Sequence, residues 1–517
     1  MKLLLSLGIT ACMAAAPGFG QSVSAREAAR FLEQASWGPT PGSIAQVQAM
    51  GINGWLASQF ALNTSDLPDQ PIRNAKGNFN QNLAPVQAAF FQNTIAGGDQ
   101  LRQRVAFALS QIWVVSATTG LPIAYAYPPY WRIFRDNAFG NYRDLIKAVT
   151  LSPAMGAYLN MVNNFKANPA KGTAANENYG RELMQLFTLG LTQLNLDGTP
   201  VLDSNSNPMP TYDQSVVVDM AKALTGWTYP TAPGAKARAE NPPYYFGEMI
   251  PVESEHDTTA KTIFNGIVIP AGQTAEQDLN SVLDALMSQP TMAPFISQQL
   301  IQHLVTSNPS TDYVERIAQV FEDDGTGVRG NLQAVITAIL TDPEARAGDS
   351  GPASITANFG HLREPILFMS NLLRGLNATA GAANGITAAT TNMSQELFYP
   401  PSVFSYFSPQ YRTEHGLLGP EFQIYTTQTA VNRADTVNQL LYANMPGVRI
   451  NLQPYLPYAG DTNTLLDYIA RIFLRSGMSS QLQSSAAAAA DAQSTPMAKV
   501  QAALYTVLTS AEYQVIQ

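Results

Sequence analysis

Helix start and stop signals recur along the chain, and this recurrence constrains the fold more than any other feature. Gly140 and Gly330 precede amphipathic segments whose apolar positions match. The first segment ends at Pro153 and the second at Pro343, after the same interval. A fixed interval between such boundary signals is typical of helical pairs that bury their apolar stripes against one another. We therefore predict a mainly α-helical, multi-helical protein built partly from stacked helical pairs.

The end of the chain repeats this pattern once more. The stretches 312–317 and 467–472 share the pattern Asp-Tyr-x-x-Arg-Ile, which reads as a helix start. We predict that residues 312–345 and 467–513 form similar helical pairs, with 140–153 matching the second helix of each. The alternative is chance similarity between short capped helices.

Signals for β-strands are sparse. Two sets of turn residues, Asp-Gly and Asn-Ser-Asn, predict a small β-hairpin region at 193–212, and 262–269 is a further candidate strand. Small and polar residues predict a flexible linker or loop over 376–396. This linker separates a helical main domain, 21–375, from a C-terminal helical region, 397–517.

The first 20 residues have the features of a targeting segment. A lysine precedes the apolar run 3–16, and small residues follow it. A positive residue, a short apolar core and small residues at the cleavage point are the parts of a signal peptide. We expect residues 1–20 to be removed and the protein to be exported to the periplasm or the medium, with Gln21 or Arg26 as its first residue. The alternative is a lipoprotein acylated at Cys12.

Composition limits the possible partners and cofactors. The formal net charge is −9 without a basic cluster, which argues against nucleic acid. No later apolar stretch has the length of a membrane span. Cys12 is the only cysteine, so the mature chain would have no thiolate ligand. We assign no metal ligands and leave the cofactor unknown, since any metal site would be oxygen-rich and would suit Ca²⁺ or Mg²⁺.

Two clusters of ionisable residues are candidates for catalysis. Glu177 and Arg181 are four residues apart on an expected helix and share a face, while Glu182 lies about 100° around it. His256 and Asp257 form the second cluster, because a histidine beside a carboxylate can act as a general base or a metal ligand. The alternative is a structural ion-pair network on the first helix.

An aromatic segment over 398–407 is the candidate ligand site. Phe404 and Tyr406 in this segment, together with Trp227, are assigned to binding an apolar or sugar ligand, because pockets favour aromatic side chains with few polar groups. The alternative is a loop that fills the core.

A set of short motifs runs in a fixed order along almost the whole chain from Ser24. The motifs are Arg30-Phe31-Leu32, Ala35 to Thr40, Gly51-Ile52 with Trp55-Leu56, Arg102 to Ser110, Glu177-Asn178-Tyr179 with Arg181-Glu182-Leu183, Leu224 to Trp227, Ser307-Asn308-Pro309, Gly327 to Gly330, Arg363-Glu364-Pro365 and Pro400 to Phe404. This ordered set resembles the bacterial "domain of unknown function 1800" family.

The resemblance implies a large exported bacterial protein, without agreed catalytic residues to transfer. Genes of this family often neighbour a second uncharacterised exported family, numbered 1501, which is therefore a candidate partner. Many relatives carry a histidine in the helix after the Arg-Glu pair, where this chain has Phe187. If that histidine were catalytic, this chain would lack it.

The sequence is compatible with two classes of function. Because the sequence contains no complete catalytic constellation, we expect an exported cell-envelope protein that binds or assembles with a partner. The alternative is an exported enzyme with a carboxylate and histidine acid–base site or an oxygen-ligand metal site.

Overall fold

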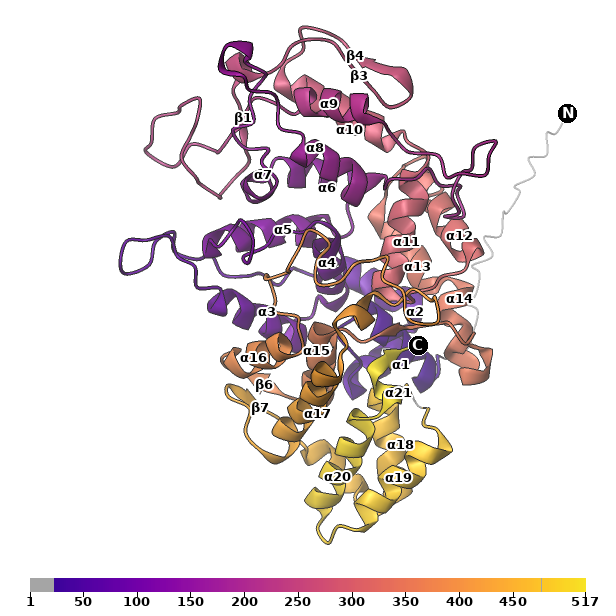
Figure 1. Cartoon of the computed structure of the whole chain (residues 1–517). Helices are drawn as coiled ribbons and strands as arrows, with labels where there is room; N and C mark the ends of the chain where they lie inside the picture. The colour runs from indigo at the N-terminus through magenta and orange to yellow at the C-terminus, as the bar shows by residue number, and fades with distance from the viewer. Residues whose placement is uncertain (1–22, 476) are drawn as a thin grey trace, which may run out of the picture.

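Helices dominate the computed structural model, which describes residues 23–475 and 477–517. The predicted signal peptide and Cys12 lie outside these ranges. Within them, no helix combines the length and apolarity needed to cross a membrane. The mainly α-helical fold class is confirmed (Figure 1).

The helices fall into two halves of the chain. The first half contains α1 (Ala25–Ala35), α2 (Pro41–Phe60), α3 (Ala84–Ala96), α4 (Gln100–Ile112), α5 (Tyr127–Asn137), α6 (Tyr142–Thr150), α7 (Pro153–Tyr158), α8 (Asn178–Glu182), the π-helix η3 (Leu183–Thr188) and α9 (Gln214–Ala223). The second half contains α10 (Ala275–Met287), α11 (Met292–Leu304), α12 (Thr311–Glu322), α13 (Leu332–Thr341), α14 (Pro343–Arg346), α15 (Pro365–Gly375), α16 (Asn384–Asn392), the 3₁₀ helix η8 (Pro420–Ile424), α17 (Thr427–Tyr442), α18 (Thr462–Phe473), α19 (Ser480–Asp491), α20 (Pro496–Leu508) and α21 (Ala511–Gln514).

The strands are short and form four antiparallel pairs in the described ranges. The pairs are β1 (Trp227–Thr228) with β2 (Ile250–Pro251), β3 (Lys261–Ile263) with β4 (Ile267–Ile269), β5 (His361–Leu362) with β8 (Val515–Ile516), and β6 (Thr379–Ala380) with β7 (Val448–Arg449). The pair β5–β8 brings the end of the chain back to its centre, close to α1 in Figure 1.

The two matched segments of the sequence meet each other in space. Asn141 and Asn331 form an antiparallel bridge. The N–H groups of Tyr142 and Leu332 donate to the opposite glycine carbonyls at 2.8 and 2.9 Å. Each asparagine side chain also caps its own helix, α6 or α13. The repeated signal therefore marks two helices that begin side by side.

Stacked helical pairs are present, but one of them lies differently from the prediction. Ser310, the N-cap of α12, donates its N–H to Glu344 of α14 at 3.0 Å, after the intervening helix α13. Ser479, the N-cap of α19, donates in the same way to Glu512 of α21 at 3.1 Å. The counterpart of α12 is therefore α19 rather than α18. The prediction of a single pair over 467–513 is wrong because the matching helix start at 467 lies in α18, an additional helix.

Of the other secondary-structure predictions, the hairpin region is confirmed, while the candidate strand and the linker differ from the structure. The range 193–212 contains the bridges Leu194–Pro200 and Leu202–Pro208, so the hairpin region is confirmed. The candidate strand 262–269 is instead a hairpin, because Asn265 and the following glycine turn the chain with φ of 54° and 77°. The expected linker 376–396 contains β6 and α16, and α16 packs against α3, α15 and α17.

One continuous hydrophobic cluster runs through both predicted regions of the chain. It extends from Ala28 in α1 to Ile516 in β8 and includes Ile386 and Ala389 of α16. The segment 376–396 is therefore part of the common core, in contrast to the linker that its small, polar composition predicts.

Candidate functional site

The predicted cluster on α8 lies at the surface. Glu177 and Arg181 form an ion pair of 2.7 Å, and their side chains are 35% and 38% exposed. The amide of Gln214 bonds to both, at 3.0 and 3.3 Å. Burial raises the pKa of Glu182, and Arg181 offsets this only in part. The first predicted cluster is thus a partly exposed ion pair beside one half-buried carboxylate.

His256 belongs to a separate, buried group. Its Nε2 lies 3.1 Å from Oδ2 of Asp278, and its Nδ1 lies 2.9 Å from the carbonyl oxygen of Thr225. Lys261 donates to the same Asp278 oxygen at 2.5 Å, and the side chains of His256, Lys261 and Asp278 are all 0% exposed. We call these three side chains the buried triad. Within residues 23–475 and 477–517, no hydrogen bond or ion pair joins it to the α8 cluster.

Asp257 and Trp227 lie beside the buried triad. Burial raises the pKa of Asp257, but hydrogen bonds from Thr259 and the charges of Lys261 and Lys222 together outweigh burial, so that the pKa lies below its usual value. Trp227 is buried in β1. Gly226 precedes it with φ of +83°, and a Cβ at this position would lie 2.8 Å from the Cβ of His256. The close packing around His256 is typical of a structural group.

A second group of buried polar side chains was not predicted from the sequence. It lies where α4, α11, β5, η8 and the start of α15 meet. We call it the polar cluster, and it consists of the buried residues Arg104, His361, Glu364 and Glu421 together with the half-buried His303. Arg104, with 0% exposure, donates to the carbonyl oxygen of His303. Burial lowers its pKa to about 10, against the pull of the two glutamates, so the guanidinium stays charged at neutral pH.

Both carboxylates of the polar cluster are held by neighbouring side chains. Oε1 of Glu421 lies 3.1 Å from Nδ1 of His361. Glu364 accepts hydrogen bonds from Gln111, at 3.1 Å, and from Gln395. Burial raises the pKa of Glu364 even though Arg104 and these amides favour its charged form. The cluster therefore combines a buried cation with two buried carboxyl groups.

Several buried atoms in and around the polar cluster have no hydrogen-bond partner in the described part of the chain. They are Nε and Nη1 of Arg104, Oε1 of Gln111, Nε2 of Gln299, Nε2 of His361 and Oε2 of Glu421. Most buried polar atoms in proteins do have a partner. A group of exceptions in one place therefore indicates a site that is completed by another molecule, water included.

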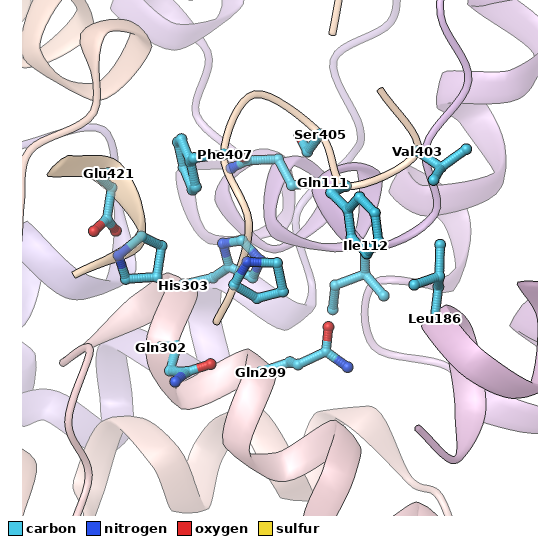
Figure 2. A pocket seen from close by; sticks show the side chains of 13 residues that line it. Gln111, Ile112, Leu186, Gln299, Gln302, His303, Val403, Ser405, Phe407 and Glu421 are labelled. Carbon is cyan, nitrogen blue, oxygen red and sulfur yellow. The ribbon is translucent and has the colours of Figure 1, made fainter. Parts of the chain in front are cut away.

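Three of these atoms border a cavity of about 50 Å³, which we call the inner cavity. Figure 2 shows Gln299 and Gln302 on α11, Gln111 and Ile112 on α4, and Val403, Ser405 and Phe407 on the loop that covers them. His303 also lines this cavity, and burial lowers its pKa to about 3, which keeps its ring neutral. The volume exceeds the ~10–15 Å³ that one water needs.

The predicted aromatic segment forms part of this site. Phe404, 44% exposed, lines the inner cavity. Tyr406 lines a neighbouring cavity of about 40 Å³ that shares Gln111 and Ser405 with the first. The hydroxyl of Tyr406 donates to the carbonyl oxygen of Glu396 at 2.5 Å. The structure thus places two predicted ligand residues at adjoining cavities and the third, Trp227, in β1.

A larger groove lies on the other side of the pair formed by His361 and Glu421. Its volume is about 580 Å³, and we call it the outer groove. Its walls come from residues 357–362, the loop 411–418, Phe422 and Tyr425 in and after η8, and the end of the chain. Glu421 lines the inner cavity and His361 lines the outer groove, so this one pair contributes to both.

The structure gives no candidate for a metal centre in the ranges it describes. There, no three side chains among His, Cys, Asp and Glu gather closely enough to hold an ion.

Comparison with known proteins identifies the chain at the family level. The model of a family described as "Protein of unknown function (DUF1800)" matches residues 30–515. No curated protein and no solved structure matches the chain.

Proposed function

The chain belongs to the DUF1800 family, and we propose that it is an exported protein of the bacterial cell envelope that binds a small polar ligand in the inner cavity and acts with a partner. One observation carries this proposal. Oε1 of Gln111, Nε2 of Gln299 and Oε2 of Glu421 are buried around one cavity and find no partner in the described ranges.

The chemistry of these atoms defines the ligand. Two acceptors and one donor without partners in the described ranges come from residues that line the cavity, while Ile112, Leu186 and Phe407 supply apolar walls. A buried polar group without a hydrogen bond costs ~1–3 kcal/mol, which a matching ligand would recover. The ligand is therefore small and offers both donors and an acceptor.

Export and partnership rest on the sequence. The lysine and the apolar run 3–16 support export, with a periplasmic or extracellular destination. Family resemblance supports an exported protein of the neighbouring 1501 family as the partner. A tagged copy in the native envelope should enrich that protein over a tagged unrelated periplasmic control, and equal recovery with both baits would remove the partner from the proposal.

Native mass spectrometry of the protein purified from its own envelope fraction tests the ligand. We expect a bound small molecule on the wild type and its loss in Gln299→Leu, which removes the unpartnered amide. Gln319→Leu on the exposed face of α12 is the matched control and should keep the ligand. Retention of the same mass in Gln299→Leu would refute the assignment of the cavity.

An acid–base enzyme is a second candidate, and the arrangement of His361 favours it. Glu421 holds Nδ1 of His361, and Nε2 has no partner within residues 23–475 and 477–517. A carboxylate that orients an imidazole in this way prepares its other nitrogen for proton transfer. If this candidate is correct, Glu421→Gln should abolish complementation of a gene deletion without lowering the melting temperature. A variant that complements fully would exclude it.

A further inference from the structure

We propose that the outer groove is a binding site for a neutral saccharide. This inference does not depend on the inner cavity, because it concerns a different space with different walls. It goes beyond the aromatic segment 398–407, for which the sequence suggested a sugar or an apolar ligand.

Aromatic side chains form the apolar part of the outer groove. Phe359, Tyr411, Phe422 and Tyr425 line it. Phe422 is 37% exposed and meets the ring of Tyr425 edge to face at 6.0 Å. The guanidinium of Arg433 lies 5.1 Å from the centre of the Tyr425 ring and holds it in place. Such rings offer flat surfaces on which the C–H groups of a sugar ring can pack.

A buried hydrogen-bonding atom accompanies these rings. His361 lines the groove and is 4% exposed, and its Nε2 has no partner in the described ranges. Glu421 lies at Nδ1, so Nε2 is an acceptor when the ring is neutral and a donor when the ring is protonated. A sugar hydroxyl can serve either form, because it both donates and accepts, whereas a purely apolar ligand would leave Nε2 unsatisfied.

Charge distinguishes a neutral sugar from other polar ligands. Among the residues that the structure describes, those that line the groove include Glu414, His361 and His415, and neither lysine nor arginine. An anionic group such as a phosphate or a uronic acid would therefore meet a carboxylate and no permanent cation. Hydroxyl-rich, uncharged rings fit both the aromatic walls and the electrostatics.

The outer rim of the groove is preorganised. The side chain of Asn308 donates to the carbonyl oxygen of Leu418 at 2.8 Å and accepts from its N–H at 2.9 Å. Thr413 and Leu417 close the turn of the same loop at 2.8 Å. A rim that is fixed before binding loses little conformational entropy when a ligand arrives.

A glycan array that contains neutral and acidic oligosaccharides tests the proposal on the full mature chain. We expect binding to neutral oligosaccharides. Isothermal titration with the best neutral oligosaccharide of the array should show affinity reduced at least about tenfold in Phe422→Ala, a loss of about 1.4 kcal/mol. His361→Gln should also weaken binding, while Gln299→Leu in the inner cavity should leave it unchanged.

Three results would overturn the proposal. These are the absence of binding to any neutral glycan, a preference for acidic glycans, and an affinity that is unchanged in both Phe422→Ala and His361→Gln. Phe422 is exposed, so its variant is expected to fold, and circular dichroism checks this. Unchanged glycan binding in Gln299→Leu also separates this test from that of the inner cavity.

Discussion

Replacement of Asp278 by asparagine should destabilise the protein by ~3–5 kcal/mol. Asp278 is 0% exposed and accepts from Lys261 at 2.5 Å and from His256 at 3.1 Å. Asparagine keeps the size of the side chain but removes its charge, which takes the hydrogen-bonded carboxylate away from the equally buried Lys261 and leaves only the more distant charge of Asp257. A buried charge that loses its direct partner is among the most costly defects that a single substitution can create.

Urea unfolding followed by circular dichroism measures this loss against a matched control. Glu177→Gln also removes a carboxylate from an ion pair, but Glu177 and Arg181 are more than a third exposed, so the expected loss is ~0–1 kcal/mol. The double variant Lys261→Met, Asp278→Leu should recover part of the stability, since an apolar pair needs no counter-charge, while Nε2 of His256 still loses its partner. If Asp278→Asn has the same free energy of unfolding as Glu177→Gln, the buried triad does not stabilise the fold.

Three further predictions concern single positions. Gly226→Ala should cost at least ~2–3 kcal/mol in urea unfolding, because the new Cβ would lie 2.8 Å from that of His256. Gly172→Ala is the control: it has φ of +65° and open space around it, so it should cost only the ~1–2 kcal/mol of the left-handed backbone. Equal losses in the two variants would refute the predicted clash with His256. Lowering the pH from 7 to 5 should remove about 2 kcal/mol of stability through His303. Burial lowers the pKa of this residue from 6.5 to about 3, so the unfolded chain takes up a proton that the folded chain does not. This loss of stability should disappear in His303→Gln, and the same pH dependence in the variant and the wild type would contradict the prediction. Glu182→Gln should change stability by less than about 1 kcal/mol at pH 7, or raise it slightly, because burial raises the pKa of Glu182 and so penalises its charged form; a loss above about 2 kcal/mol would show that the carboxylate has a stabilising partner.

Local signals in the sequence were sufficient for individual helices. Ser24 caps α1 with Glu27, and Thr40 caps α2 with Ser43, because these caps depend on residues three positions apart. The matching starts at Asn141 and Asn331 also follow from local patterns. Their direct pairing depends on tertiary structure, which periodicity does not encode.

The buried sites depend on residues that lie far apart in the chain. The hairpin of β3 and β4 lies between His256 and its partner Asp278 in α10. Nothing in the sequence around His256 indicates that carboxylate. Arg104 and Glu364 lie within motifs that support the family resemblance. Both are buried, whereas the sequence pattern of amphipathic helices leads one to expect charged residues to face solvent. Their burial is decided by the packing of distant helices, so the polar cluster could not be predicted.

A crystal structure of the protein purified from its native envelope tests the central proposal most directly. We expect electron density for a small ligand in the inner cavity, within hydrogen-bond distance of Oε1 of Gln111, Nε2 of Gln299 and Oε2 of Glu421. Density for ordered water alone at these three atoms, in protein that still complements the gene deletion, would contradict it.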